Sequence, residues 1–260
     1  MSRSRSIRPD PWRALRTLTP ARIALGRVGS ALPTAEVLRF GVAHAQARDA
    51  VHEAFDCDRL ARDLQTLDRT PLHVHSRAPD RATFLLRPDL GRRLRTEDAD
   101  SLRRHARAGG LCLVLGDGLS ARAVHAHAPP LIAEFLRLVA DRFAPVTTVI
   151  AEQARVALGD EIGACLGSAI VAVLIGERPG LSSPDSLGIY LTFAPHVGRN
   201  DAERNCLSNI RAEGMPPAKA ARRLLWLVDA ASRLQLTGVG LKDDSDAAHQ
   251  TRASLPGCRD

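Results

Sequence analysis

The sequence predicts an α/β protein in which a mostly parallel sheet carries helices on both faces. Short apolar or β-branched runs alternate with helical segments from about residue 110 onwards, which is typical of parallel strands joined by helical crossovers. The residues before that point have mainly helical periodicity, which indicates a smaller helical region in front of the sheet. With 260 residues, 45% of them hydrophobic, the chain is long enough to bury a core without disulfide bonds.

The first 108 residues divide into a tail and a mainly helical region. Residues 1–18 consist largely of Arg, Ser and Pro and are expected to form a flexible basic tail. In region 19–108, which also holds one or two short strands, apolar residues recur every three or four positions behind Pro33 and predict a helix with one buried stripe. We expect His44 on that stripe to be a core histidine and not a ligand. The stripe comprises Val37, Phe40, His44, Ala47, Val51 and Phe55.

Residues 109–242 are predicted to form the sheet domain. Apolar runs predict strands at 111–115, 146–150, 169–175 and 189–193, and helical periodicity predicts helices at 120–138, 159–166 and 217–234. The first of these helices is expected to be interrupted at Pro129 and Pro130, because proline removes a helical hydrogen bond and clashes with the preceding turn. Residues 243–260 are polar and are expected to form a second flexible tail.

Composition limits the partners and the compartment. The net charge of +7 would permit nucleic-acid binding, but beyond the first residues the arginines are mixed with acids, and a single tyrosine offers little base stacking. We therefore expect no nucleic-acid partner. The five cysteines are odd in number and form no C-x-x-C pair, which suggests neither a zinc ribbon nor a disulfide framework. No run approaches a membrane span or the apolar core of a signal peptide, so we expect a cytoplasmic protein with no membrane partner.

One glycine motif offers a first functional hypothesis. Residues Gly116 to Ala121 (GDGLSA) match G-x-G-x-x-[G/A] between a predicted strand and a predicted helix, as in a stand-alone dinucleotide-binding oxidoreductase. The acid expected about 20 residues further on has no candidate at a strand end before Glu152, and Asp117 would place a carboxylate beside the phosphates. The other interpretation is a tight turn with Ser120 as the helix N-cap. Both remain open at this point.

The histidines do not predict a metal site. His73 and His75 form one H-x-H pair, and His125 and His127 form another, but neither has a third ligand in register. We therefore expect surface histidines and no metal ligands. The sequence also contains no P-loop, no H-E-x-x-H and no G-x-S-x-G motif.

Three polar segments are expected to share one edge of the sheet. Ligands of open parallel sheets bind beyond the carboxyl ends of the strands, and the segments at those ends are 116–120, 151–156 and 177–183. Together they predict a broad, shallow shelf that suits a large flat ligand or the surface of another protein. Within it, Glu177 and Arg178 form either a loop ion pair or part of a binding site.

Six segments carry a resemblance to a known family. They lie in collinear order from about Thr19 to Lys242 and closely resemble the small subunit of ethanolamine ammonia-lyase. The segments are TPARIALGRVGSALPTAEVLRF (19–40), FLLRPDLGRRL (84–94), LGDGLS (115–120), RVALGDEIGACLG (155–167), LIGERPGLSSPDSLGIYLTFAP (174–195) and AERNCLSNIR (202–211).

The resemblance implies an adenosylcobalamin-dependent lyase that converts ethanolamine to acetaldehyde and ammonia. In that family a TIM-barrel large subunit holds the substrate, and the small subunit covers the cofactor with a Rossmann-like domain, in a hetero-oligomer of paired subunits. The cofactor-binding positions would be Val156, Glu177 and Cys206, with no catalytic residue in this chain. The implied location is the bacterial cytoplasm, and packaging inside an ethanolamine-utilisation microcompartment is left open.

Physical chemistry supports these positions. The corrin rim carries primary amides that need hydrogen-bond partners when covered, so Glu177 is expected to accept from one of them, with backbone groups near Val156 and Cys206. The alternative role for Cys206 is that of a cobalt ligand. None of the nine histidines lies in D-x-H-x-x-G, so we expect the cofactor to keep its own base on cobalt. Phe193 and His196 depart from the family pattern, where tyrosine and arginine are frequent.

Overall fold

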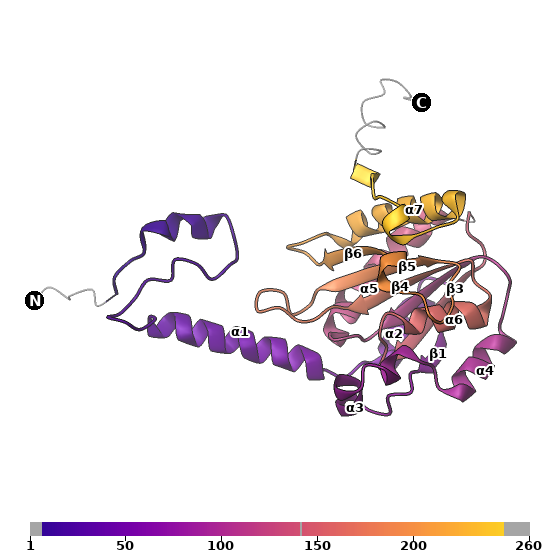
Figure 1. Ribbon diagram of the computed structural model, residues 1–260, viewed down its shortest axis with the longest axis horizontal. Coiled ribbons are helices and arrows are strands. Elements are labelled where there is room, and N and C mark those ends of the chain that lie inside the picture. The colour runs from indigo at the N-terminus through magenta and orange to yellow at the C-terminus, as the bar shows by residue number, and fades with distance from the viewer. Residues whose placement is uncertain (1–6, 141, 247–260) are drawn as a thin grey trace, which may run out of the picture.

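The computed structural model describes residues 7–140 and 142–246 and is built on one six-stranded sheet with the strand order β1-β3-β2-β4-β5-β6 (Figure 1). Of the two predicted tails, 1–18 and 243–260, residues 1–6 and 247–260 lie outside the described residues. The strands are β1 (Leu72–His75), β2 (Leu111–Gly116), β3 (Val146–Glu152), β4 (Ile170–Gly176), β5 (Leu187–Phe193) and β6 (Asn205–Ile210). The helices are α1 (Thr34–His52), α2 (Cys57–Gln65), α3 (Arg81–Leu86), α4 (Thr96–Arg104), α5 (Ala121–Val139), α6 (Leu158–Leu166) and α7 (Pro217–Leu234).

The predicted α/β class with helices on both faces is confirmed. Strands β1, β3, β2 and β4 are parallel, whereas β5 runs antiparallel to both β4 and β6, so the sheet is mixed at one side. One face packs against α2, α5 and α7, and the other packs against α4 and α6. Strands β2 and β4 are buried along their whole length, because helices cover them from both sides.

Helix α5 differs from the prediction, since it runs without a break through Pro129 and Pro130. The two prolines each remove one helical N–H donor, yet Ala128, Leu131 and Ile132 around them are buried in the core. The packing of this apolar face against the sheet therefore outweighs the lost hydrogen bonds. No helix in the described part of the chain is long and apolar enough to cross a membrane.

Helix α1 forms where predicted, but its expected stripe is not buried. Ala43 and Ala50 are the buried residues of this helix, whereas Val37 and Phe40 are about half exposed. His44 is also exposed and stacks on the Phe40 ring, so the expectation of a core histidine is wrong. The reason is that the residues after α1 contact it near its C-terminal end, where Ala50 is fully buried and the Val51 carbonyl accepts from Arg81 Nε.

Candidate functional site

The three polar segments meet at one edge of the sheet. In the register, Gly116 at the end of β2 lies beside Ala151 of β3 and Ile175 of β4. The Ala154 N–H donates to the Asp117 carboxylate at 2.8 Å, which joins the first segment to the second. The Leu119 N–H donates to the Gly176 carbonyl at 2.9 Å. This bond joins the first segment to β4, the strand that ends just before the third segment begins at Glu177.

The glycine motif forms a closed turn. The Ser120 hydroxyl accepts from the Ala123 N–H at 3.3 Å as the N-cap of α5, and it donates to the Pro184 carbonyl at 2.9 Å. The N–H groups of Gly118, Leu119 and Ser120 all donate within the chain. These three N–H groups are therefore not available to bind a phosphate at this turn, and the geometry favours the tight-turn interpretation.

Asp117 in this turn is fully buried and serves the fold. Its carboxylate accepts from the Gly118 N–H, and Arg81 Nη1 lies 3.0 Å from Oδ2. Burial raises the pKa of the Asp117 carboxyl to about 6, although the backbone donors and Arg81 favour the charged form. Arg81 Nε also donates to the Val51 carbonyl at 2.7 Å, so the residue connects this turn to the end of α1.

Replacing Gly118 by alanine is expected to destabilise the chain. Gly118 has a positive φ of 54°, and an ideal Cβ there would lie 2.3 Å from the Gly176 carbonyl oxygen, which is backbone and cannot move aside. Gly109 is a matched control, because its φ is also positive (82°) but its Cβ would meet nothing within 4 Å. Thermal unfolding at low protein concentration should show Gly118→Ala about 2 kcal/mol less stable than Gly109→Ala. Equal stability of the two variants would contradict the close approach.

Two hydrogen bonds hold one carboxylate oxygen of Glu177, and the other carboxylate oxygen has no hydrogen-bond partner among the described residues. Its Oε2 accepts from the Ser186 hydroxyl and, at 3.2 Å, from the Asn209 N–H. No hydrogen bond from the described residues reaches Oε1, which lies over Gly188, where an ideal Cβ would come within 3.0 Å of it. The hydrogen-bond partners of Glu177 are Ser186 and Asn209, and within the described residues no ion pair joins it to the exposed Arg178, so the loop ion pair is not formed. Glu177 therefore offers an oriented acceptor oxygen.

The Asn209 donor depends on an irregularity in the sheet. The pairing of β5 and β6 shifts register between Leu187 and Ile189, and Asn209 has a φ of 57°. Asparagine tolerates this left-handed conformation better than most residues. The irregularity releases the Asn209 N–H from the regular ladder, so that it can donate to Glu177.

Tyr190 and Cys206 lie beside Glu177. They are paired across β5 and β6, so their side chains project from the same face of the sheet. Burial raises the pKa of Tyr190, and the nearby Cys206 and Glu177 raise it further. The pKa of Cys206 is raised by loss of surrounding water and by Glu177, although its side chain reaches the surface. The thiol is therefore protonated at neutral pH, which does not favour a thiolate ligand.

Val156 reaches the same face through packing. It lies between β3 and α6, is partly buried, and packs with Tyr190 against the core on the α4 and α6 side. The structure thus brings Glu177 and Cys206 together and places Val156 on their face of the sheet. Tyr190 was missed by the sequence analysis, although it is the only tyrosine of the chain and follows Gly188 by two residues in a predicted strand.

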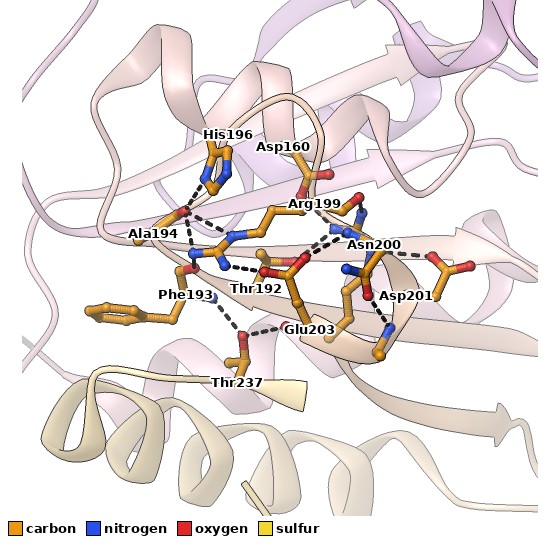
Figure 2. A network of polar contacts seen from close by, with 12 residues as sticks. Asp160, Thr192, Phe193, Ala194, His196, Arg199, Asn200, Asp201, Glu203 and Thr237 are labelled. Carbon is orange, nitrogen blue, oxygen red and sulfur yellow. Dashed lines mark hydrogen bonds and ion pairs between the residues drawn. The ribbon is translucent and has the colours of Figure 1, made fainter. Parts of the chain in front are cut away.

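A buried ion pair between Asp160 and Arg204 connects the helix that follows Val156 to the strand that holds Cys206 (Figure 2). Arg204 Nη1, just before β6, lies 2.5 Å from Asp160 Oδ1 of α6, and both side chains are 2% exposed. The same Nη1 donates to the Thr192 hydroxyl of β5 at 3.1 Å. The pair therefore fixes α6, which follows Val156, against the strand that holds Cys206.

The loop between β5 and β6 closes around the same pair. Arg204 Nη2 donates to the Arg199 carbonyl at 2.9 Å, and Arg199 in turn donates to the Phe193 carbonyl at 3.1 Å (Figure 2). His196 Nδ1 lies 3.1 Å from the Ala194 carbonyl. Since Phe193 takes part through its backbone, its departure from the family pattern leaves these contacts in place.

The histidine pairs lie elsewhere. On β1, His73 is exposed and His75 is partly buried. His125 of α5 is buried, stacks on Phe55, and accepts from the Asp56 N–H at 3.1 Å, so the expectation of a surface histidine is wrong there. Within residues 7–140 and 142–246, no group of three or more His, Cys, Asp or Glu side chains is placed to hold a metal ion.

Comparison with known proteins points to a single family. The family model described as ethanolamine ammonia-lyase light chain matches residues 9–242. The ethanolamine ammonia-lyase small subunit of Pseudomonas putida F1 is 54% identical over 248 residues, which cover 93% of this chain and 91% of the relative. The small subunit of Xanthomonas campestris pv. campestris is 54% identical over 244 residues, covering 91% of this chain and 89% of the relative.

Proposed function

The chain belongs to the ethanolamine ammonia-lyase light chain family, and from this premise we propose that it binds adenosylcobalamin through the β4–β6 face that carries Glu177. Membership makes it the small subunit of a lyase whose partner is a large subunit. The proposal adds the cofactor, the residues that hold it and the division of labour between the two subunits.

The Oε1 of Glu177, which accepts no hydrogen bond from the described residues, carries the proposal. Two donors hold Oε2, so the carboxylate is oriented before any ligand binds, and Oε1 is left to accept a hydrogen bond. The absence of a side chain at Gly188 provides the space that this oxygen occupies. A primary amide of the corrin rim is a donor of the required kind, since its N–H groups need an acceptor when protein covers them.

Val156 and Cys206 provide the rest of the proposed contact. Val156 offers apolar surface and nearby backbone groups, and the protonated Cys206 thiol with Tyr190 offers a weakly polar wall. The cofactor keeps its own base on cobalt in this proposal, and Cys206 contacts the ring without ligating the metal. This chain binds and orients the cofactor with its Glu177 face.

When bound, adenosylcobalamin would supply radical chemistry to the reaction. Such chemistry requires that water and oxygen stay out of the site. The small subunit would serve this requirement by covering one side of the cofactor with a rigid sheet face, fixed by the buried pair of Asp160 and Arg204. No residue of this chain is proposed to be catalytic.

The substrate site is assigned to the large subunit. We propose that this partner is a TIM barrel that converts ethanolamine to acetaldehyde and ammonia, in a higher hetero-oligomer of paired subunits in the bacterial cytoplasm. Dinucleotide binding at Gly116 to Ala121 is not supported, because the turn's own residues use the N–H groups of Gly118 to Ser120.

Replacing Glu177 by alanine tests this proposal. The variant is expected to weaken cofactor binding by about 1.5 to 3 kcal/mol, or roughly 10- to 150-fold, since the corrin amide loses a charged acceptor. The measurement is an absorbance titration of the co-purified subunit pair with cyanocobalamin, which needs no turnover. Glu134→Ala is the control, because Glu134 lies in α5 on the opposite face and pairs with Arg137. An unchanged titration for Glu177→Ala would remove Glu177 from the site.

A further inference from the structure

The N-terminal arm, defined as residues 7–52, exposes a large share of the apolar surface of the chain. Eleven large hydrophobic side chains are exposed in the arm, against five in all the other described residues. Isolated exposed hydrophobic residues are ordinary, but a concentration of this kind marks a surface that another protein covers. The eleven are Ile7, Trp12, Leu15, Leu18, Ile23, Val28, Leu32, Val37, Leu38, Phe40 and Val42.

The N-terminal half of helix α1 is apolar over about 200° of its circumference, and Glu36 and Arg39 lie on the remaining side. At about 100° per residue, Val37 and Phe40 lie on one side of the helix, and Leu38 and Val42 lie on the other. Leu38 is 64% exposed and Val42 is 58% exposed. A helix that packs on one surface typically carries an apolar stripe about 100° wide, and the apolar arc of α1 is about twice that width. The N-terminal half of α1 therefore fits a groove better than a flat surface.

The arm is shaped by its own contacts. The Arg8 N–H donates to the Arg27 carbonyl at 2.7 Å, and the Arg27 N–H donates to the Arg8 carbonyl at 3.1 Å. Arg16 lies 3.6 Å from Glu36 of α1, and the Arg22 guanidinium lies 5.8 Å above the Phe40 ring. The segment before α1 thus folds back along the helix and still leaves its apolar side chains uncovered.

The arm adjoins the proposed cofactor face. Arg22 Nη2 lies 3.5 Å from the Leu181 carbonyl, in the loop that begins with Glu177. A cleft between the arm and this loop is lined by Pro20, Ser182 and Pro184, among others. Figure 1 shows α1 and the segment before it extending away from the sheet and its covering helices. A partner that covers Glu177 would therefore also meet the arm.

From these observations we propose that the arm is a docking element that inserts α1 into an apolar groove of the large subunit. The inference rests on the proposed function, in which the large subunit covers the Glu177 face. Charge argues against a second copy of this chain as the occupant. The arm holds seven Arg and three Asp or Glu, a formal charge of +4, which leaves +3 of the total +7 for the rest of the chain. Two positive surfaces do not complement each other, so the groove is expected to have an acidic rim.

Hydrogen exchange of the wild-type subunit pair tests the arm without any substitution. If α1 is inserted in the large subunit, its backbone amides at 34–45 should exchange as slowly as those of the buried helices α5 and α7. If instead the arm stands free, those amides should exchange far faster than α5 and α7, because an isolated helix frays. The second result would overturn the proposal.

Paired substitutions test the apolar contact itself. The double variant Leu38→Ser with Val42→Ser should bind the large subunit at least about tenfold more weakly in a dilution series measured by light scattering. The control is Leu86→Ser with Val239→Ser, because these side chains are 81% and 90% exposed on the body and lie outside the arm. Wild-type affinity of the arm variant would overturn the proposal, and so would loss of self-association with large-subunit binding intact. Neither measurement uses cobalamin, so a failed Glu177 titration leaves the result interpretable.

Discussion

The variant Arg204→Met is expected to lower the free energy of unfolding by about 3 to 5 kcal/mol, because it leaves Asp160 as a buried carboxylate without its partner. Both side chains are 2% exposed, and the Nη1 to Oδ1 distance is 2.5 Å. The Thr192 hydroxyl, which accepts from Arg204 at 3.1 Å, also loses its donor. The measurement is chemical denaturation of the chain at neutral pH.

The pH dependence of this loss has a defined sign. Burial raises the pKa of Asp160 above its ordinary value even though Arg204 lowers it, and without Arg204 the pKa should rise further. The folded state then binds a proton more readily than the unfolded state does. Stability of Arg204→Met should therefore recover as the pH falls through the folded pKa toward the unfolded value of about 4.

Two further variants distinguish the contribution of the buried pair to stability from that of the neighbouring charge. Asp201 also reaches Arg204, at 3.4 Å, but its side chain is 96% exposed, so Asp201→Ala should leave stability nearly unchanged. The double variant Asp160→Leu with Arg204→Met removes both charges and should regain most of the lost stability. If Arg204→Met alone were as stable as the wild type, the ion pair would not hold α6 against β6.

The chain alone is expected to release no ammonia from ethanolamine. In the proposed function it has no catalytic residue and no substrate site, so turnover should require both adenosylcobalamin and the large subunit. The chain alone should also be poorly soluble, because both the arm and the Glu177 face would lack their partner. The assay compares the small subunit, the large subunit and the co-expressed pair under the same conditions.

The control for this assay is the omission of the cofactor. Omitting adenosylcobalamin from the co-expressed pair should abolish ammonia release, and adding it to either subunit alone should not restore it. Ethanolamine turnover by the small subunit alone would contradict the proposed function. Tight binding of NADH would instead favour the oxidoreductase hypothesis at Gly116 to Ala121.

Sequence reasoning worked best where burial is complete. The runs in β2 and β4 are apolar at nearly every position because helices cover both faces, and this leaves a strong signal in the sequence. Helix α7 was predicted with its observed ends at Pro217 and Leu234, since one side of it packs on the core at regular spacing.

The elements that were missed or misjudged depend on contacts that the sequence does not display. In β6, Leu207 and Ile210 are buried while the residues between them are exposed, so no apolar run marks the strand. Helix α1 has the expected apolar spacing, but spacing does not reveal whether the covering surface belongs to the same chain.

The candidate site could be only partly predicted. The sequence indicated that Glu177 lies at the end of a buried strand, and the resemblance added Val156 and Cys206. The geometry that orients Glu177 arises from Gly188, Ser186 and the irregular pairing at Asn209. Such an irregularity depends on how two distant strands register, which a linear pattern does not specify.

The most direct test of the central claim is the alkylation rate of Cys206 in the subunit pair. Cys206 is exposed in the isolated chain, while Cys112 and Cys165 are buried and serve as internal references. Peptide mass spectrometry after timed maleimide labelling would follow each thiol separately, with and without saturating cyanocobalamin. If the Glu177 face covers the cofactor, labelling of Cys206 should slow markedly when cobalamin is added. An unchanged labelling rate of Cys206 in the cobalamin-loaded pair would contradict the claim.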